Sequence, residues 1–70
     1  MEQNRDYCGN YTVWWNDSTV YFEHNKLGED DAICCYLEGR TVIDYDMAFG
    51  MHDEVREWLE SNGYNTEEIL

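Results

Sequence analysis

Two tryptophans stand next to each other, Trp14 and Trp15, at the end of the run YTVWW. A second run rich in β-branched and aromatic residues, TVYFEH at 19–24, follows after the turn residues NDS. This pattern predicts a β-hairpin. Because neighbouring side chains of a strand point to opposite faces of a sheet, one tryptophan can enter a core while the other needs a second surface to contact. We therefore expect a sheet with apolar side chains on both faces.

Two further β-type runs follow, AICCYLE at 32–38 and TVIDYD at 41–46, joined through Gly39 and Arg40. The segment NKLGEDD at 25–31 is expected to be a loop that carries an acidic cluster. Residues 1–10 are polar and indicate a loose lead-in.

The segment MHDEVREWLESNGY is the only strongly helical one, because Met51, Val55, Trp58 and Leu59 recur at helical spacing. Gly63 is expected to end this helix, and the residue after it is placed for the apolar contact that often accompanies such an end. The predicted fold is α+β: a single domain over 1–70, with a small antiparallel sheet of four strands (two hairpins) and one C-terminal helix packed on one face, in the order ββββα.

The loop lengths decide which side chains share a face of the sheet. An even first loop and a three-residue second loop place one set beneath the helix: Tyr11, Val13, Trp15, Val20, Phe22, Ile33, Cys35, Leu37, Ile43 and Tyr45. The opposite face then holds Trp14, Tyr21, Cys34, Tyr36, Val42, Asp44 and Asp46. A two-residue second loop would put Asp44 among the apolar side chains, where an unpaired charge is costly. A three-residue first loop would exchange Trp14 and Trp15.

The formal charge of −12 comes from 16 acidic and 4 basic residues. A small domain usually carries a net charge of magnitude about 2–8. An excess of this size suggests a partner of the opposite sign. It argues against direct binding to nucleic acid or to anionic membranes, since both require Lys and Arg.

The remaining patterns predict no metal, no cofactor and no catalytic residue. Cys8, Cys34 and Cys35 form no Cys-x-x-Cys spacing and are expected to be buried apolar side chains. The run that starts at Asp44 and Asp46 begins like a calcium loop but lacks its later ligands. The N-terminus has no apolar core region and no run is long enough to span a membrane, so we expect a cytoplasmic protein of a bacterial host cell.

The candidate partner-binding residues are of two kinds. The carboxylates expected to supply charge are Asp44, Asp46, Asp53, Glu57, Glu60, Glu29, Asp30 and Asp31. The aromatic side chains expected to supply desolvated contacts are Trp14, Tyr21 and Tyr36. Asp44 and Asp46 would lie ~6.7 Å apart along a strand, and such a row of carboxylates can imitate a nucleic-acid backbone.

The leading hypothesis is a non-enzymatic inhibitor that binds a basic nucleic-acid-handling protein, with DNA or RNA mimicry as the candidate mode of binding. In size, acidity and lack of a catalytic motif the chain resembles anti-defence proteins of phages and mobile elements, such as anti-CRISPR proteins and other DNA mimics. This similarity is of general character and assigns no residue a role. The alternatives are an immunity protein or antitoxin for a basic toxin, and an acidic homodimeric interaction module.

Overall fold

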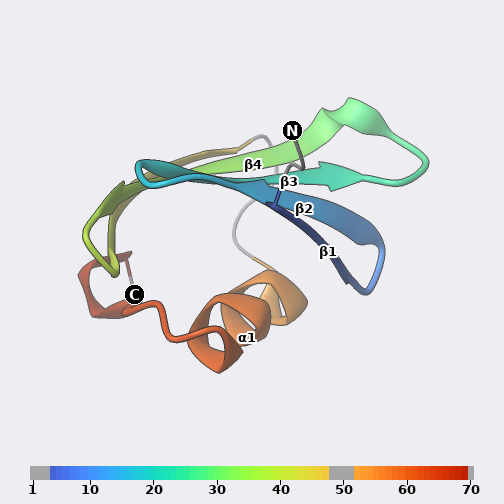
Figure 1. Ribbon diagram of the computed structural model, residues 1–70. Helices are drawn as coiled ribbons and strands as arrows, with labels where there is room; N and C mark the ends of the chain where they lie inside the picture. Colours follow the sequence, from blue (N-terminus) through green and yellow to red (C-terminus); the bar gives the residue numbers. More distant parts are fainter. Residues whose placement is uncertain (1–3, 48–51, 70) are drawn as a thin grey trace.

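The computed structural model describes residues 4–47 and 52–69, which form one antiparallel sheet and one helix. The sheet has the strand order β1-β2-β3-β4-β5, and α1 lies against one of its faces (Figure 1). The elements are β1 (Asn4–Cys8), β2 (Tyr11–Trp15), β3 (Thr19–His24), β4 (Gly28–Glu38), β5 (Thr41–Met47), α1 (Asp53–Ser61) and a 3₁₀ turn η1 (Glu67–Ile69). The predicted α+β class, with the helix on one face, is confirmed; the predicted number of four strands is wrong by one.

The additional strand is β1, in the segment that the sequence suggested was a loose lead-in. It runs antiparallel to β2, with Cys8 opposite Tyr11 and Asn4 opposite Trp15. Of its side chains only that of Cys8 is buried, so the strand shows little of the apolar alternation that marks the others. The turn after it needs Gly9, because the backbone there has φ 56° and a Cβ would collide with the Glu54 carboxylate of α1.

The first hairpin has the predicted even loop. Trp15 pairs with Val20, and Asn16 closes the turn by accepting hydrogen bonds from the backbone N–H groups of Ser18 (2.8 Å) and Thr19 (2.9 Å). The predicted core face of this hairpin is confirmed. Tyr11, Val13, Val20 and Phe22 are buried, and Trp15 is partly buried against them.

The second hairpin differs from the prediction, because a β-bulge shifts its register. Leu37 pairs with Val42 across a two-residue turn, whereas Tyr36 pairs with Asp44, so Ile43 has no partner. Val42 is fully buried and Ile43 is 48 % exposed, the reverse of the predicted arrangement. The extra residue lets both Val42 and Tyr45 face the core while Asp44 stays on the other side of the sheet.

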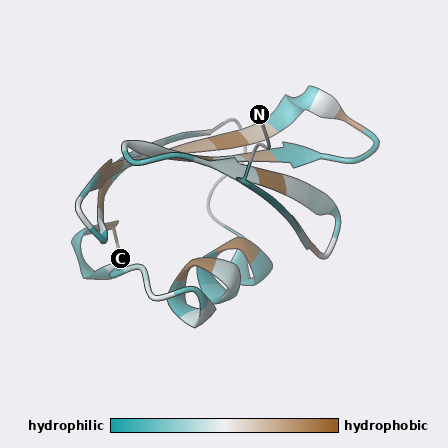
Figure 2. Cartoon of the chain, viewed as in Figure 1, coloured by the Kyte–Doolittle hydropathy of each residue, from teal (hydrophilic) through white to brown (hydrophobic). Residues whose placement is uncertain are grey.

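The helix contributes Val55, Trp58 and Leu59 to the core, as its spacing predicted. The Trp58 ring lies 5.4 Å from that of Trp15 and 5.6 Å from that of Phe22, and its indole N–H donates a 2.8 Å hydrogen bond to Asp6 of β1. In Figure 2 the hydrophobic colour follows the central strands and the side of α1 that faces them. Met51 and the link over 48–50 lie outside the described residues.

The helix ends as predicted at Gly63, which has φ 85°. Its N–H donates to the carbonyl of Glu60 and that of Tyr64 donates to the carbonyl of Leu59, the pair of bonds that defines a Schellman end. Tyr64 is buried and its ring stacks on Trp58 at 6.2 Å. The chain then returns to the sheet, where Asn65 forms a parallel bridge with Thr41.

Because of the bulge in β5, we expect substitutions at two neighbouring residues to differ in their effect on the free energy of unfolding. Val42→Ala should lower the free energy of unfolding by about 2 kcal/mol, because it removes two buried methyl groups and leaves a cavity. Ile43→Ala should change it by about 0.5 kcal/mol or less, as at most exposed positions. Urea unfolding followed by tryptophan fluorescence measures both values. A larger loss for Ile43→Ala would mean that the register lacks the bulge.

The hydrogen bond between Asp6 and Trp58 predicts a pH dependence. It lowers the pKa of the Asp6 carboxyl below its ordinary value of 3.8, with the backbone N–H of Tyr7 as a second cause. A carboxyl whose pKa is lowered by folding stabilises the fold above the unfolded pKa, and this stabilisation disappears as the pH falls through the folded pKa. Asp6→Asn should therefore melt at a lower temperature than the wild type at pH 7, and the difference between the two proteins should narrow as the pH falls below 3.8.

The matched control is Asp17→Asn, which removes the same charge from an exposed turn residue. Circular dichroism melts of the three proteins between pH 7 and pH 2 give the comparison. Equal effects of the two substitutions at pH 7 would show that net charge, and not the bond to Trp58, sets the difference.

Candidate interaction surface

The face of the sheet that points away from α1, here called the outer face, carries a row of side chains across all five strands. The strand registers place these residues side by side in the order Arg5, Trp14, Tyr21, Cys34, Asp46. The Trp14 and Tyr21 rings lie 6.1 Å apart at 35°. This contact is a cross-strand pair of the kind that stabilises a sheet. Both rings are only partly buried.

A second group on the outer face surrounds Tyr36. Tyr36 is 40 % exposed and pairs directly with Asp44, while Asp46 pairs with Cys34 two residues away on the same strand. Asp44 and Asp46 are both exposed. Five of the sequence-predicted residues are therefore brought together on one face: Trp14, Tyr21, Tyr36, Asp44 and Asp46.

The pKa values of the two tyrosine hydroxyls on this surface are raised, and nearby carboxylates are among the causes. The pKa of the Tyr21 hydroxyl is raised, first by partial burial and then by the nearby carboxylates of Glu23 and Glu29. The pKa of the Tyr36 hydroxyl is raised as well, first by its hydrogen bond with Cys34 and then also by Asp46 and Asp44. Each ring thus has two carboxylates within electrostatic reach.

The helix carboxylates lie on the other side of the molecule. Asp53, Glu57 and Glu60 belong to α1, which packs on the inner face of the sheet, so they cannot act together with Asp44 and Asp46 on one flat partner. Arg56 also interrupts the predicted acidic row, because its guanidinium lies 3.6 Å from Asp53 and 3.7 Å from Glu60.

The predicted acidic loop at 29–31 is instead the start of β4. Glu29 and Asp30 are exposed, as a partner-binding role requires. Asp31 is buried, accepts a 2.9 Å hydrogen bond from the Tyr11 hydroxyl and lies 4.0 Å from His52. The prediction that Asp31 is a surface charge is wrong, because β4 extends back to Gly28 and Asp31, two residues before the buried Ile33, falls on the core face of the strand.

Sequence reasoning missed Arg5 and Tyr7, which also belong to the outer face. Arg5 lies 5.9 Å from the centre of the Tyr7 ring, and Tyr7 is 64 % exposed. The two turn residues Gly9 and Asn10 between NRDYC and YTVWW are typical of a two-residue β-hairpin loop, and they are the signal that could have identified this strand.

The cysteines divide between the two faces. Cys8 and Cys35 are buried, as predicted, whereas Cys34 is only partly buried on the outer face. Burial raises the pKa of the Cys8 thiol to about 11 and that of Cys35 to about 12, so both stay protonated at neutral pH. Within the described residues, no group of three His, Cys, Asp or Glu side chains is arranged to hold a metal ion.

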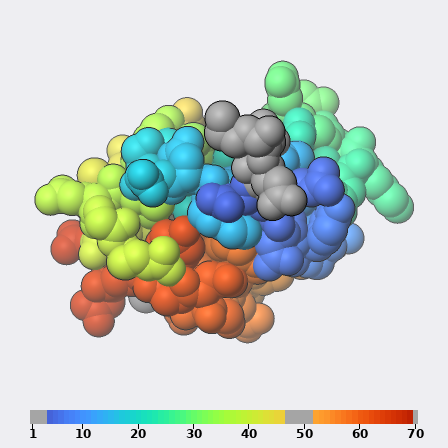
Figure 3. All heavy atoms as spheres, viewed as in Figure 1, coloured from blue at the N-terminus to red at the C-terminus, as the bar shows by residue number. Residues whose placement is uncertain are grey.

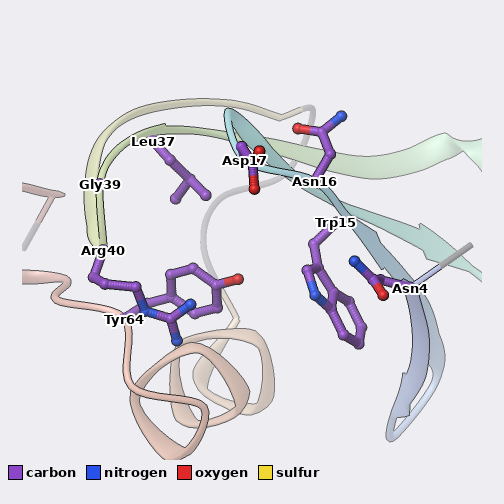
Figure 4. Close-up of a pocket in the computed structure, with 8 residues that line it drawn as sticks. All are labelled: Asn4, Trp15, Asn16, Asp17, Leu37, Gly39, Arg40 and Tyr64. Carbon is purple, nitrogen blue, oxygen red and sulfur yellow. The ribbon is translucent and has the colours of Figure 1, made fainter.

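A hollow of about 400 Å³ lies at the opposite end of the sheet from the β1–β2 turn. The four chain segments that line it meet on the side shown in Figure 3, and Figure 4 shows Trp15, Leu37, Arg40 and Tyr64 around it. The Arg40 guanidinium lies 4.0 Å from the centre of the Tyr64 ring and donates to the carbonyls of Asn62 and Gly63. Arg40 therefore holds the end of α1 against the β4–β5 hairpin.

Comparison of the chain with protein-family models, with curated proteins and with solved structures found no match. No helix among the described residues is long and apolar enough to cross a membrane.

The contacts of Arg40 predict a difference between two arginines that both lie over tyrosine rings. Arg40→Ala should lower the free energy of unfolding by about 1 kcal/mol, which corresponds to about 4–8 °C in melting temperature, because it removes a cation–π contact and hydrogen bonds to the helix end. Arg5→Ala makes the same change in charge but removes only the looser contact with Tyr7, and should cost about 0.5 kcal/mol or less. Equal losses in thermal melts would contradict the proposed role of Arg40.

Proposed function

We propose that this protein is a non-enzymatic acidic inhibitor that binds a basic nucleic-acid-handling protein and occupies the site where that protein takes DNA or RNA. The observation that supports the proposal most directly is the composition of the outer face. No element among the described residues covers this face, and Tyr36 of β4 pairs directly with Asp44 of the neighbouring strand β5.

The net charge of −12 favours association with a positively charged partner. A protein that binds nucleic acid gains affinity by releasing counterions from phosphates, and its cleft is lined with Lys and Arg for that purpose. Asp44 and Asp46 repeat at ~6.7 Å along β5, which resembles the spacing of phosphates along a backbone strand. A cleft of this kind would attract the outer face by the same forces.

The aromatic side chains of the outer face can supply affinity at short range. Surface charges alone are screened by salt and contribute little once the partners touch. Trp and Tyr side chains are the ones most often found at the centre of tight interfaces, because they bury large areas at a small cost in side-chain entropy. Trp14, Tyr21 and Tyr36 supply such area amid the carboxylates.

The outer face is a better candidate than the helix surface for a physical reason. Arg56 lies among the helix carboxylates and pairs with two of them, which reduces the negative field that a basic partner would meet. We place the proposed inhibitor in the cytoplasm of a bacterial host cell, where a phage or mobile element would need to block a defence nuclease or a related nucleic-acid enzyme.

The experiment compares two charge reversals of equal size. Asp44→Lys with Asp46→Lys changes the outer face, and Glu57→Lys with Glu67→Lys changes exposed residues of α1 and η1 by the same total charge. Tagged wild type should retain a nucleic-acid-binding protein from a bacterial lysate at low salt and release it when salt or duplex DNA or RNA is added. The outer-face variant should bind this protein at least about tenfold more weakly, and the helix variant should bind nearly as well as the wild type.

The other outcomes of the pull-down point to the alternative functions. Retention of a basic toxin would favour an immunity protein. Recovery of the chain alone, with a dimer that persists in high salt during sedimentation, would favour a homodimeric module that joins through the outer face. Unchanged binding by the outer-face variant would contradict the proposed surface.

A further inference from the structure

The aromatic rings of the outer face are grouped with carboxylates in a repeated way. Glu23 lies two residues from Tyr21 on the same face of β3, and the exposed Glu29 is also near Tyr21. Tyr36 pairs directly with Asp44, and Asp46 lies two residues further along β5 on the same face. Each group offers a ring face together with two carboxylates. Such a combination complements a guanidinium group, which is planar, stacks on aromatic rings and donates in pairs to carboxylates.

Two arginines of this chain show how a guanidinium group lies over a tyrosine ring. Among the described residues, Arg5 lies over Tyr7 and Arg40 lies over Tyr64. Tyr21 and Tyr36 have no such cation over them within that part of the chain, although they lie in the more acidic surroundings. Tyr36 is 40 % exposed, and the part of the Tyr21 ring that Trp14 does not contact is exposed as well, so both rings and their carboxylates are accessible to cations from a partner.

We infer that the outer face distinguishes arginine from lysine, and that the partner surface presents two arginines to Tyr21 and Tyr36. This inference rests on the proposed function and names the partner groups that the surface takes. A lysine ammonium is a compact and strongly hydrated charge, so it is attracted by the carboxylates but gains less from a ring.

The register of the sheet sets the spacing of the two arginine positions. Tyr21 of β3 pairs with Cys34 of β4, and Tyr36 lies two residues further along β4. Tyr21 and Tyr36 are thus diagonal neighbours on adjacent strands, about 7–8 Å apart. Two arginines on one turn of a helix or on alternate positions of a strand can reach this spacing.

The test uses two peptides of equal charge, octa-arginine and octalysine, each labelled with a fluorophore. Their binding to the full chain is measured by fluorescence anisotropy at low and at physiological salt. The wild type should bind octa-arginine at least about fivefold more tightly than octalysine, and the ratio should persist as salt weakens both complexes. Tyr21→Leu and Tyr36→Leu should each bring the ratio closer to one.

The matched control is Tyr7→Leu, which removes an exposed tyrosine from the same face at the end where Arg5 lies. Its ratio should equal that of the wild type. Because the ratio compares two peptides on one protein, a general loss of folded protein lowers both affinities and leaves the ratio unchanged. A ratio that survives both Tyr21→Leu and Tyr36→Leu would overturn the inference.

Two results separate this inference from the proposed function. If the wild type binds octalysine as tightly as octa-arginine, the arginine preference is wrong while the acidic outer face remains a candidate surface for a basic protein. If the variant with Asp44→Lys and Asp46→Lys binds both peptides as tightly as the wild type, the outer face is not the binding surface. The proposed function then fails together with the inference.

Discussion

The contact of Trp58 with the sheet is the interaction on which the arrangement of the two layers depends. Its ring packs on Trp15, Phe22 and Tyr64, and its N–H is bonded to Asp6 on the edge strand. One side chain thus connects β1, β2, β3, α1 and the segment after α1. Loss of a buried tryptophan costs about 3–5 kcal/mol, which is a large part of the stability available to a domain of this size.

The packing of α1 on one face of the sheet leaves the other face uncovered by any helix of the described residues. The chain has 70 residues, and the described part of it forms five strands and one α-helix. That helix covers one face of the sheet. The adjacent tryptophans follow this division: Trp15 packs under the helix, and Trp14 joins Tyr21 on the uncovered side. Aromatic side chains on that side stabilise the sheet and at the same time create a surface that a partner can cover.

The sequence was most informative where apolar residues follow a regular period. The faces of the first hairpin, the helix and its end at Gly63 could be predicted, because each depends on local spacing or on one glycine. The bulges could not, since they depend on which register buries the most apolar area across two strands. One bulge exchanged Val42 and Ile43. Asp31 is bonded to Tyr11 because β4 begins earlier than predicted and continues its alternation of buried side chains through Asp31. β1 was missed because a strand at the edge of a sheet needs only one buried side chain, that of Cys8, to be held in place.

The three arginines of the chain lie at different places relative to the outer face. Arg40 and Arg56 are engaged near the helix, with Tyr64 and with Asp53 and Glu60, so they offset part of the negative charge on that side. Arg5 lies at the β1 edge of the outer face, and Asp44 and Asp46 lie toward the β5 edge. The charge of the outer face therefore changes across the sheet, from Arg5 on β1 to the two carboxylates of Asp44 and Asp46 on β5. A basic partner would be drawn toward β4 and β5, where Tyr36 is 40 % exposed, and would be repelled by Arg5. Such a gradient fixes the orientation of a complex as well as its affinity.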